Sequence, residues 1–580
     1  MPLQDWIHHW EVGAGARVLK VTAAILAFAA AATLYDVVAY ESFSSEEAME
    51  TAQVARNLAQ GRGYTTQSIR PLSIYLLERG QAGGATWRER WADVSNAPGY
   101  PWLLAGLMKA LPFEFTATQD WYYQPERWIA VFNQGIFLVA VMILFRVARR
   151  LFDARVAWLS AVLMAGTNLY WRFSVSGLST MWLAAVFLAV VWCLAALEER
   201  ERTGAESWAG SMGLALLAGG LTGVGGVSRY AFGWMILPVL LFVAGVGRRA
   251  PGRLCVGAAA AYLVVVSPWL ARNYELSGNC FGAAGYAIVQ ETPPFGGDTL
   301  ERSFNPEGGL RRVSVRDVVD KFLANGREIG GSQLPRLGGN WVVSFFLVGL
   351  LLPFRNAAAG RMRLFLAGSM ALLFVAQALG QTHLSQDSPQ INSENLLALA
   401  APLAFVYGVA LFYVLVDQLN TIPVVAQSTI VGIFTIIMCL PFIGALTLGN
   451  RPKVNSPYSP LHIQRVARLM LEDELLMSDI PGAVAWYGNR ECAWLSLDYD
   501  REFLKLNGLR RVRALFLTQR TTDQPFLSGM MLDPSSWGHF VEQIQARGEV
   551  PTDFPLTNAP TGFFPEQLLL SDQARWRMAP

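Results

Sequence analysis

Charged residues, cysteine and histidine are all scarce in this 580-residue chain. Charged residues make up 16% of it, whereas a soluble globular domain has about 25%. The five cysteines and five histidines lack the spacing of metal ligands or of a disulfide framework. No nucleotide-binding phosphate loop is visible, and no nucleic-acid partner is indicated. Hydrophobic residues, in contrast, make up 53% of the chain, which predicts a polytopic membrane protein.

Apolar runs of membrane length recur along the chain. A bilayer core about 30 Å thick needs roughly 20 apolar residues per helix. We expect the first run to be a retained anchor rather than a cleaved signal peptide, because its apolar character continues to Val38. About eleven runs are candidate transmembrane helices: Leu19–Tyr40, Trp128–Phe145, Val156–Tyr170, Leu178–Leu197, Ser211–Gly225, Tyr230–Val246, Leu254–Trp269, Trp341–Phe354, Leu364–Leu379, Asn395–Val416 and Val424–Leu448.

The run Gly99–Leu111 is apolar but too short to cross a bilayer. We expect it to form an interfacial or re-entrant helix. This choice places the arginines of segment 146–155 inside, in agreement with the excess of Lys and Arg in short cytoplasmic loops. The predicted protein is a multi-pass protein of a bacterial inner membrane with a cytoplasmic N-terminus. Its outer segments are then 41–127, 271–340 and 450–580.

The last outer segment, 450–580, has the pattern of a small periplasmic α/β domain that follows a transmembrane domain, 1–449. Strands alternating with helices predict a parallel sheet, and the domain is expected to dock on the rest or to act as a lid. Residues 521–580 show little periodicity and are expected to be irregular. The expected strands are Leu475–Ile480, Cys492–Leu497 and Arg513–Thr518, with helices at Pro481–Gly488 and Asp500–Gly508.

The polar stretch Ser44–Tyr64 directly follows the first apolar run. Ser44 and Glu47 have the spacing of a capping box, and glycines near the end of the stretch are expected to stop the helix. Glu46 and Glu47 are adjacent carboxylates at the membrane edge, where a partly desolvated charge is costly. Such a carboxylate can act as a general base toward a hydroxyl. Two simpler interpretations stay open: Glu47 as a capping partner alone, and Glu46 as a solvated surface residue.

An ordered set of motifs runs through roughly the first 280 residues: Glu46-Glu47, Ala55-Arg56-Asn57-Leu58-Ala59, Gly61, Gly63 and Tyr64, then Asn96–Pro101, Ala148–Phe152 and Ser267–Tyr274. This set resembles the GT-C glycosyltransferase superfamily. It is most similar to the polyprenyl-phosphate-sugar-dependent branch, which includes protein O-mannosyltransferase-like and lipid A aminoarabinose transferase-like enzymes. The resemblance implies a GT-C-like helical membrane fold and a lipid-phosphate-sugar donor.

The resemblance also implies a catalytic role for Glu47 or, as the second choice, Glu46. These residues stand where the superfamily has an acidic pair, usually with Asp. The extra methylene of Glu moves the carboxylate by about 1.5 Å, so either the pocket is adjusted for Glu or activity is reduced. The segment Ser176–Ser179 lacks the acidic residue that relatives often carry, which argues against a two-acid or metal-bridged mechanism. No cofactor is expected, and a divalent metal is an alternative without support in the sequence.

Several arginines lie at outer positions, against the positive-inside trend. A lipid phosphate there would need such cations, because guanidinium groups bind phosphate in a bidentate manner. Snorkelling or pairing with carboxylates is the alternative interpretation. The candidate donor-phosphate ligands are Arg70, Arg272, Arg56, Arg62 and Arg229. The candidate substrate-binding residues are Tyr64, Asn57 and His383, the last of which is alternatively a solvated loop residue.

The predicted function is transfer of a sugar from a polyprenyl-phosphate-linked donor to a cell-envelope acceptor at the outer face of the inner membrane. Direct displacement at the anomeric carbon would invert its configuration. Two other functions stay open: a catalytically silent GT-C relative that acts as a binding scaffold, and a transporter of lipid-linked glycans, although no repeated halves are visible. Membrane lipids are expected partners. The sequence does not identify the sugar, the acceptor or the lipid chain length.

Overall fold

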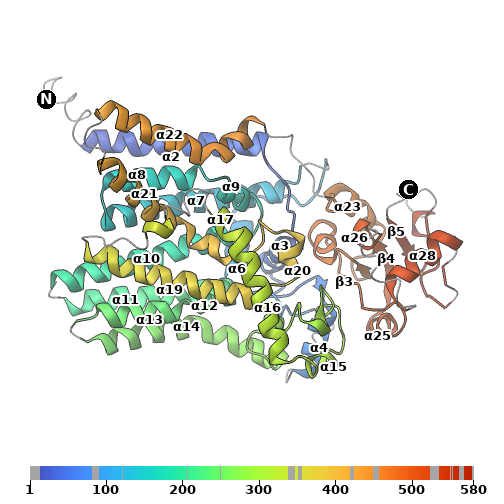
Figure 1. Ribbon diagram of the computed structural model, residues 1–580. Coiled ribbons are helices and arrows are strands. Elements are labelled where there is room, and N and C mark those ends of the chain that lie inside the picture. Colours follow the sequence, from blue (N-terminus) through green and yellow to red (C-terminus); the bar gives the residue numbers. More distant parts are fainter. Residues whose placement is uncertain are drawn as a thin grey trace.

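Long apolar helices run side by side through most of the chain (Figure 1). The computed structural model describes residues 14–80, 90–119, 122–204, 207–248, 250–337, 346–349, 356–418, 423–448, 456–522, 535–548, 550–551, 553–560 and 567–577. Within these residues, eight helices are long and apolar enough to cross a membrane. They are α2 (Ala14–Val38), α7 (Gln124–Leu151), α10 (Thr180–Thr203), α11 (Trp208–Ser228), α14 (Pro251–Ser277), α19 (Ala357–Gly380), α21 (Ala401–Gln418) and α22 (Val424–Thr447). The predicted class of helical, multi-pass membrane protein is confirmed.

Shorter helices account for most of the remaining predicted spans. The run 156–170 begins as α8 (Ala154–Ala165), and the run 230–246 forms α12 (Tyr230–Gly233) and α13 (Ile236–Val246). The short run at 99–111 forms the helix α6 (Gly99–Ala110), as predicted. The predicted span 395–416 starts instead as the 3₁₀ helix η4 (Leu396–Leu399), followed by α21. The predicted span 341–354 lies outside the described residues except for 346–349.

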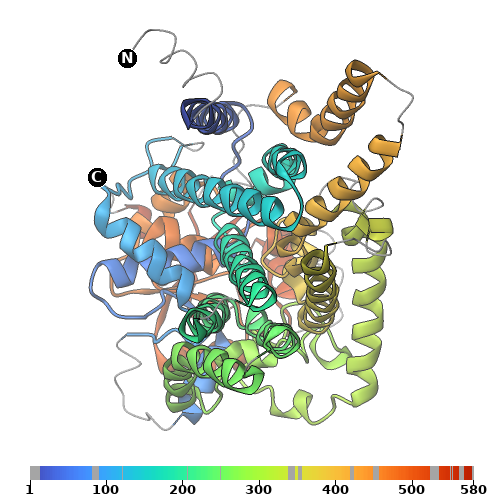
Figure 2. The same cartoon turned by 90° about the vertical axis from the view of Figure 1, so that its left-hand side faces the viewer.

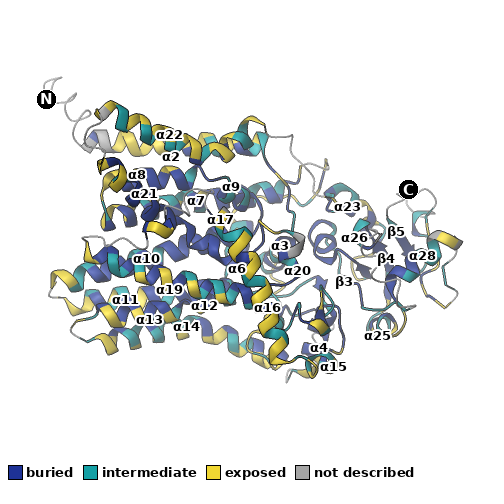
Figure 3. Ribbon diagram, in the orientation of Figure 1, coloured by how far each residue is buried: buried dark blue, intermediate teal, exposed yellow. Residues whose placement is uncertain are grey.

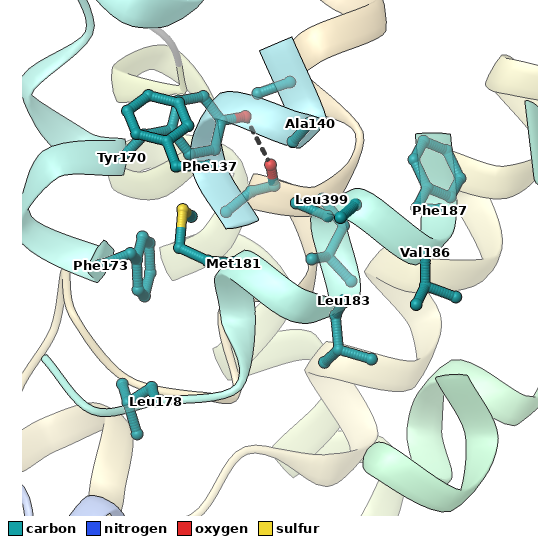
Figure 4. Packing of buried hydrophobic residues seen from close by; sticks show 14 of the residues in the cluster. Phe137, Ala140, Tyr170, Phe173, Leu178, Met181, Leu183, Val186, Phe187 and Leu399 are labelled. Atoms are coloured by element: carbon teal, nitrogen blue, oxygen red, sulfur yellow. Dashed lines mark hydrogen bonds between the residues drawn. The ribbon is translucent and has the colours of Figure 1, made fainter. Parts of the chain in front are cut away.

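The helices at the centre of the bundle are largely buried, and those at its edge are not. Helix α10 is buried over most of its length, whereas few residues of α2 and α22 are buried (Figure 3). Figure 2, which looks along the bundle, shows dark blue α2 and orange α22 at its periphery. In the centre, Phe137 and Tyr170 pack with Met181 and Leu399 (Figure 4). The Tyr170 hydroxyl donates to the Ala398 carbonyl at 2.9 Å, so this polar group is satisfied inside the apolar core.

The polar stretch after α2 forms the helix α3 (Glu46–Ala59), which begins one residue later than predicted. The N-cap is Ser45, whose hydroxyl accepts from the Ala48 amide at 3.3 Å. The predicted capping box of Ser44 and Glu47 is therefore wrong, because two adjacent serines offer the same capping chemistry and the helix uses the second. As a consequence, the carboxylate of Glu47 is available for other contacts.

A five-stranded sheet with the order β1-β3-β2-β4-β5 lies at one end of the bundle. The predicted parallel strands are present as β2 (Leu475–Ser478), β3 (Cys492–Trp494) and β4 (Val512–Leu517). Strand β1 (Ser68–Ile69) comes from the segment between α3 and α4 (Pro71–Arg79) and pairs with β3. Strand β5 (Leu568–Ser571) runs antiparallel to β4.

The expectation that residues 521–580 are irregular is wrong for part of this segment. Besides β5, it contains the helix α28 (Trp537–Arg547). The ring of Trp537 is fully buried, and its indole N–H donates to the Ser496 carbonyl at 2.9 Å. Packing against the sheet thus organises a segment whose own sequence shows weak periodicity.

Two buried arginines, Arg56 and Arg302, bind the C-terminal part of the chain to segments 41–127 and 271–340. Arg56 of α3 donates to the carbonyls of Ala485 and Trp486 at 2.7 and 2.9 Å. Arg302 donates to the carbonyls of Leu495 and Ser496 at 2.8 and 2.7 Å. Because these carbonyls are buried, the guanidinium groups satisfy acceptors that would otherwise be costly.

Candidate active site

A cavity of about 220 Å³ lies between the helix ends and the segments 41–127 and 271–340, on the side of the bundle that carries the sheet (Figure 1). Residues of α3, α6, α12 and the loop before η4 line it together with parts of the segment 283–301. Polar and apolar groups alternate on its wall, as expected for a site that binds an amphipathic ligand. Its charged lining residues are Glu47, Arg70, Arg229, Glu301 and Glu394.

Glu47 faces this cavity from the first turn of α3. Its Oε1 accepts from Nη1 of Arg229 at 3.2 Å, and its Oε2 accepts from the hydroxyl of Ser393. The side chain is 24% exposed, so a substrate hydroxyl has access to the carboxylate. Arg229, the N-cap residue of α12, and Ser393 hold the carboxylate in one orientation, which a general base requires.

Glu46 contacts a different part of the molecule. It lies buried, with Nη1 of Arg520 2.5 Å from Oε1 and the Gly482 amide donating to Oε2 at 3.2 Å. Burial raises the pKa of Glu46 to about 8, although the nearby Arg520 opposes this effect. The two adjacent carboxylates are thus separated: Glu47 lines the cavity of about 220 Å³, and Glu46 joins α3 to the C-terminal part of the chain.

Arg70 also lines the cavity, but two carboxylates bind it. Nη2 lies 2.5 Å from Glu50 and Nη1 lies 3.0 Å from Glu301. Burial opposes the charge, yet Glu301 and Glu50 together raise the pKa of Arg70 above its ordinary value. The sequence analysis did not single out Glu50 or Glu301. Glu50 follows Glu47 by three residues on α3, but Glu301 lies far away in the chain and carries no local signal.

Three more of the predicted phosphate ligands are not among the residues that line this cavity. Arg56 is buried against carbonyl groups, as described above. Arg62 is exposed just beyond α3. Arg272 donates to the carbonyls of Asp93 and Tyr64 at 2.9 and 3.3 Å, and its guanidinium lies 4.4 Å from the centre of the Trp269 ring.

Two of the predicted substrate-binding residues shape the loop beside the cavity. The Tyr64 hydroxyl donates to the carbonyl of Asn96, a lining residue, at 3.0 Å. The Asn57 amide donates to the Thr65 carbonyl at 3.0 Å and so closes the turn after α3. Neither residue lines the cavity.

His383, at the start of α20 (His383–Asp387), is buried rather than solvated. It lines a second, enclosed space of about 40 Å³ together with Glu46 and Glu47. Its ring meets the Trp494 ring edge-on, with centroids 5.9 Å apart. Its Nδ1 is buried and makes no hydrogen bond to any described residue. His383 and Glu47 therefore share the lining of this second space.

A lysine at the cavity edge was not predicted. Lys321, on α16 (Val315–Glu328), donates to the carbonyl of the lining residue Ala287 at 2.8 Å. Burial lowers the pKa of Lys321 to about 8. Among the described residues, no group of three or more His, Cys, Asp or Glu side chains is arranged to hold a metal ion.

Comparisons with solved structures find proteins of a similar fold. ArnT from Cupriavidus metallidurans, bound to undecaprenyl phosphate, is 12% identical and has a TM-score of 0.55 over 97% of this chain and 98% of that chain. AglB from Archaeoglobus fulgidus, in complex with an inhibitory peptide and a dolichol-phosphate, is 12% identical with a TM-score of 0.55 over 89% of this chain and 71% of that chain. The protein has the GT-C fold of membrane glycosyltransferases.

The sequence comparisons cover less of the chain. A family model described as dolichyl-phosphate-mannose-protein mannosyltransferase matches residues 96–271. No curated protein matches this sequence. The family match covers less than half of the chain, and the solved structures show the shared fold; both agree with the predicted resemblance to the GT-C superfamily and with a chain that spans a membrane several times.

Proposed function

We propose that this GT-C protein transfers a sugar from a polyprenyl-phosphate donor to an acceptor hydroxyl of the cell envelope. The observation that carries the proposal is the position of Glu47, at a cavity between the helix ends and the outer segments, paired with Arg229. Structures of the same fold bind undecaprenyl phosphate or dolichol-phosphate, which supports a lipid-phosphate donor. The acceptor is a lipid, a glycan or a protein of the envelope.

The proposed reaction is a direct displacement. The acceptor oxygen attacks the anomeric carbon while the bond from that carbon to the phosphate oxygen breaks. The proton of the acceptor hydroxyl passes to the carboxylate of Glu47, and the electron pair of the broken bond stays on the polyprenyl phosphate. One attack from the face opposite the phosphate inverts the anomeric configuration.

Arg229 is the proposed ligand of the departing phosphate. Of the two arginines that line the cavity, Arg70 is bound to two carboxylates, whereas Glu47 is the one carboxylate that binds Arg229 among the described residues. When a donor binds, Arg229 can share its guanidinium between Glu47 and the phosphate, since its fork presents several donors. A cation placed where charge develops stabilises the transition state. The buried Lys321, which donates to the carbonyl of the lining residue Ala287, adds a further cation next to the lining.

The test is a transfer assay with the full chain in lipid vesicles. Radiolabelled polyprenyl-phosphate sugars are supplied on the side of the C-terminal residues, and release of polyprenyl phosphate is followed. Turnover with at least one lipid-linked sugar, and none with the corresponding nucleotide sugar, is the expected result. Donor binding without release would contradict the proposal and would favour a silent relative that acts as a scaffold. Movement of the intact lipid-linked sugar from one leaflet of the vesicle membrane to the other would favour a transporter.

A further inference from the structure

A second, larger cavity lies within the membrane-spanning part of the protein. It is a groove of about 640 Å³ between α2, α7, α8 and α22. Its walls are almost entirely apolar and include the rings of Phe28, Phe145, Trp158 and Phe442. The volume falls in the range of about 300 to 1,000 Å³ that is usual for ligand sites.

The two outer walls of the groove are α2 and α22, which have the smallest buried fractions of the eight membrane-length helices. In the apolar windows of α2 and α22, 11% and 6% of the residues are buried, compared with 83% in α10 (Figure 3). A gap between such helices and the bundle suits the apolar chains of a lipid, because its lining is apolar apart from Arg146 and Arg149. The groove therefore offers a lateral entry for lipid.

Two arginines mark one end of the groove. Arg146 and Arg149, near the C-terminal end of α7, both line it and are both exposed. Their neighbours are paired: Arg150 lies 2.9 Å from Glu199, and Arg155 lies 3.3 Å from Asp417. Neither Arg146 nor Arg149 forms an ion pair with any residue that the structure describes. Within the described residues, both guanidinium groups are thus available to an anionic group at this end of the groove.

This end lies one membrane thickness away from the candidate active site. Helix α7 starts at the sheet side, where Glu126 accepts from the Tyr487 hydroxyl at 2.6 Å. At 1.5 Å per residue, Arg146 is about 28 Å further along the helix than Arg127, close to the roughly 30 Å of a bilayer core. A phosphate held by Arg146 and Arg149 is thus in the opposite leaflet and cannot reach Glu47.

We propose that the groove binds an anionic phospholipid from the leaflet that faces away from the C-terminal residues. Its phosphate contacts Arg146 and Arg149, and its acyl chains lie along the rings that line α2, α7 and α22. The distance from Glu47 argues against the polyprenyl-phosphate donor as occupant. The bound lipid completes the packing between the two peripheral helices and the bundle. This site is independent of the proposed transfer reaction.

The experiment measures lipid binding to the delipidated full chain in mild detergent by native mass spectrometry. Phosphatidylglycerol and phosphatidylcholine with identical acyl chains are titrated separately. The wild type is expected to prefer phosphatidylglycerol. Because each arginine near a membrane surface contributes about 1 kcal/mol to binding of an anionic lipid, the double variant R146A/R149A should bind phosphatidylglycerol about 30-fold more weakly. Its phosphatidylcholine binding should not change.

The matched control is R150A/R155A, which removes the same charge from the same face but from arginines that already have carboxylate partners. It should keep the lipid preference. Val162→Trp, which fills the groove from α8, should weaken binding of both lipids. Equal binding of the two lipids by the wild type, or an unchanged preference in R146A/R149A, would overturn the proposal. So would displacement of phosphatidylglycerol by polyprenyl phosphate at lower concentration, since the carrier lipid would then be the occupant.

Discussion

Glu46 and Glu47 are neighbours in the sequence, but their carboxylates contact arginines from different parts of the chain. Oε1 of Glu46 lies 2.5 Å from Arg520, whereas Oε1 of Glu47 lies 3.2 Å from Arg229. The first contact attaches α3 to the C-terminal part of the chain, and the second lies at the cavity wall. Substitutions at the two positions should therefore have different effects on stability and on catalysis.

Replacing Arg229 by Ala should lower the turnover number roughly 10²-fold, because Glu47 loses the cation that orients it. The Michaelis constant for the donor should also rise, since the same guanidinium is proposed to bind the phosphate. Arg229→Lys should recover part of the binding but not the two-pronged geometry. Steady-state kinetics check this. Arg172→Ala is the control, because Arg172 donates to Gln390 and is not among the lining residues. An equal loss in both variants would contradict the assigned role.

Ser393→Ala removes a hydrogen bond to the Glu47 carboxylate. A hydrogen bond to a charged group contributes about 1.5 to 3 kcal/mol, so the turnover number should fall roughly ten- to hundredfold with donor binding unchanged. Ser388→Ala is the control in the same loop, because that hydroxyl donates to the Ile391 carbonyl instead. If Ser393→Ala turns over at the wild-type rate, Ser393 does not position Glu47.

Arg56 and Arg62 were both predicted to bind phosphate, and the structure gives them different surroundings. Arg56→Ala leaves two buried carbonyls without their donor and should cost at least about 3 kcal/mol of stability. Arg62→Ala changes an exposed residue and should stay within about 0.5 kcal/mol of the wild type. Thermal unfolding and limited proteolysis of the C-terminal residues measure both. A stable Arg56→Ala protein with weakened donor binding would instead support the phosphate role.

The protonation of Glu46 should make stability depend on pH. Burial raises its pKa from 4.5 to about 8, so the folded protein keeps the proton through neutral pH. The stabilising contribution is complete below the ordinary pKa and is lost as the pH rises through about 8. Glu46→Gln cannot ionise, so its melting temperature should fall less than that of the wild type between about pH 6 and pH 9. If the melting temperatures of Glu46→Gln and the wild type fell equally across this pH range, that would contradict a neutral Glu46.

The long apolar helices and the parallel strands β2, β3 and β4 could be predicted because each carries its signal within a few turns or residues of chain. Strand β1 could not, since two residues hold no periodic pattern and gain their partner more than 400 residues later. The cap at Ser45 was missed because Ser44 beside it is chemically equivalent.

The candidate site could be predicted only where the signal is local in the sequence. The adjacent pair of acidic residues is such a signal, and it is why Glu47 was selected as a candidate. The partners that decide what each charged group does are remote: Arg56 meets Ala485, and Arg70 meets Glu301. In the sequence, a buried arginine with carbonyl or carboxylate partners cannot be distinguished from an arginine that is available to bind a phosphate. Only the folded arrangement separates the two.

The most direct test compares Glu47→Gln with Glu46→Gln in the polyprenyl-phosphate release assay, with donor binding measured in parallel. The account predicts that the turnover rate of Glu47→Gln is lower by a factor of about 10² to 10⁴, because a general base is removed. The variant should still bind the donor. Glu46→Gln should keep most of the activity. Full activity in Glu47→Gln, or a selective loss in Glu46→Gln, would contradict the assignment of Glu47 as the base.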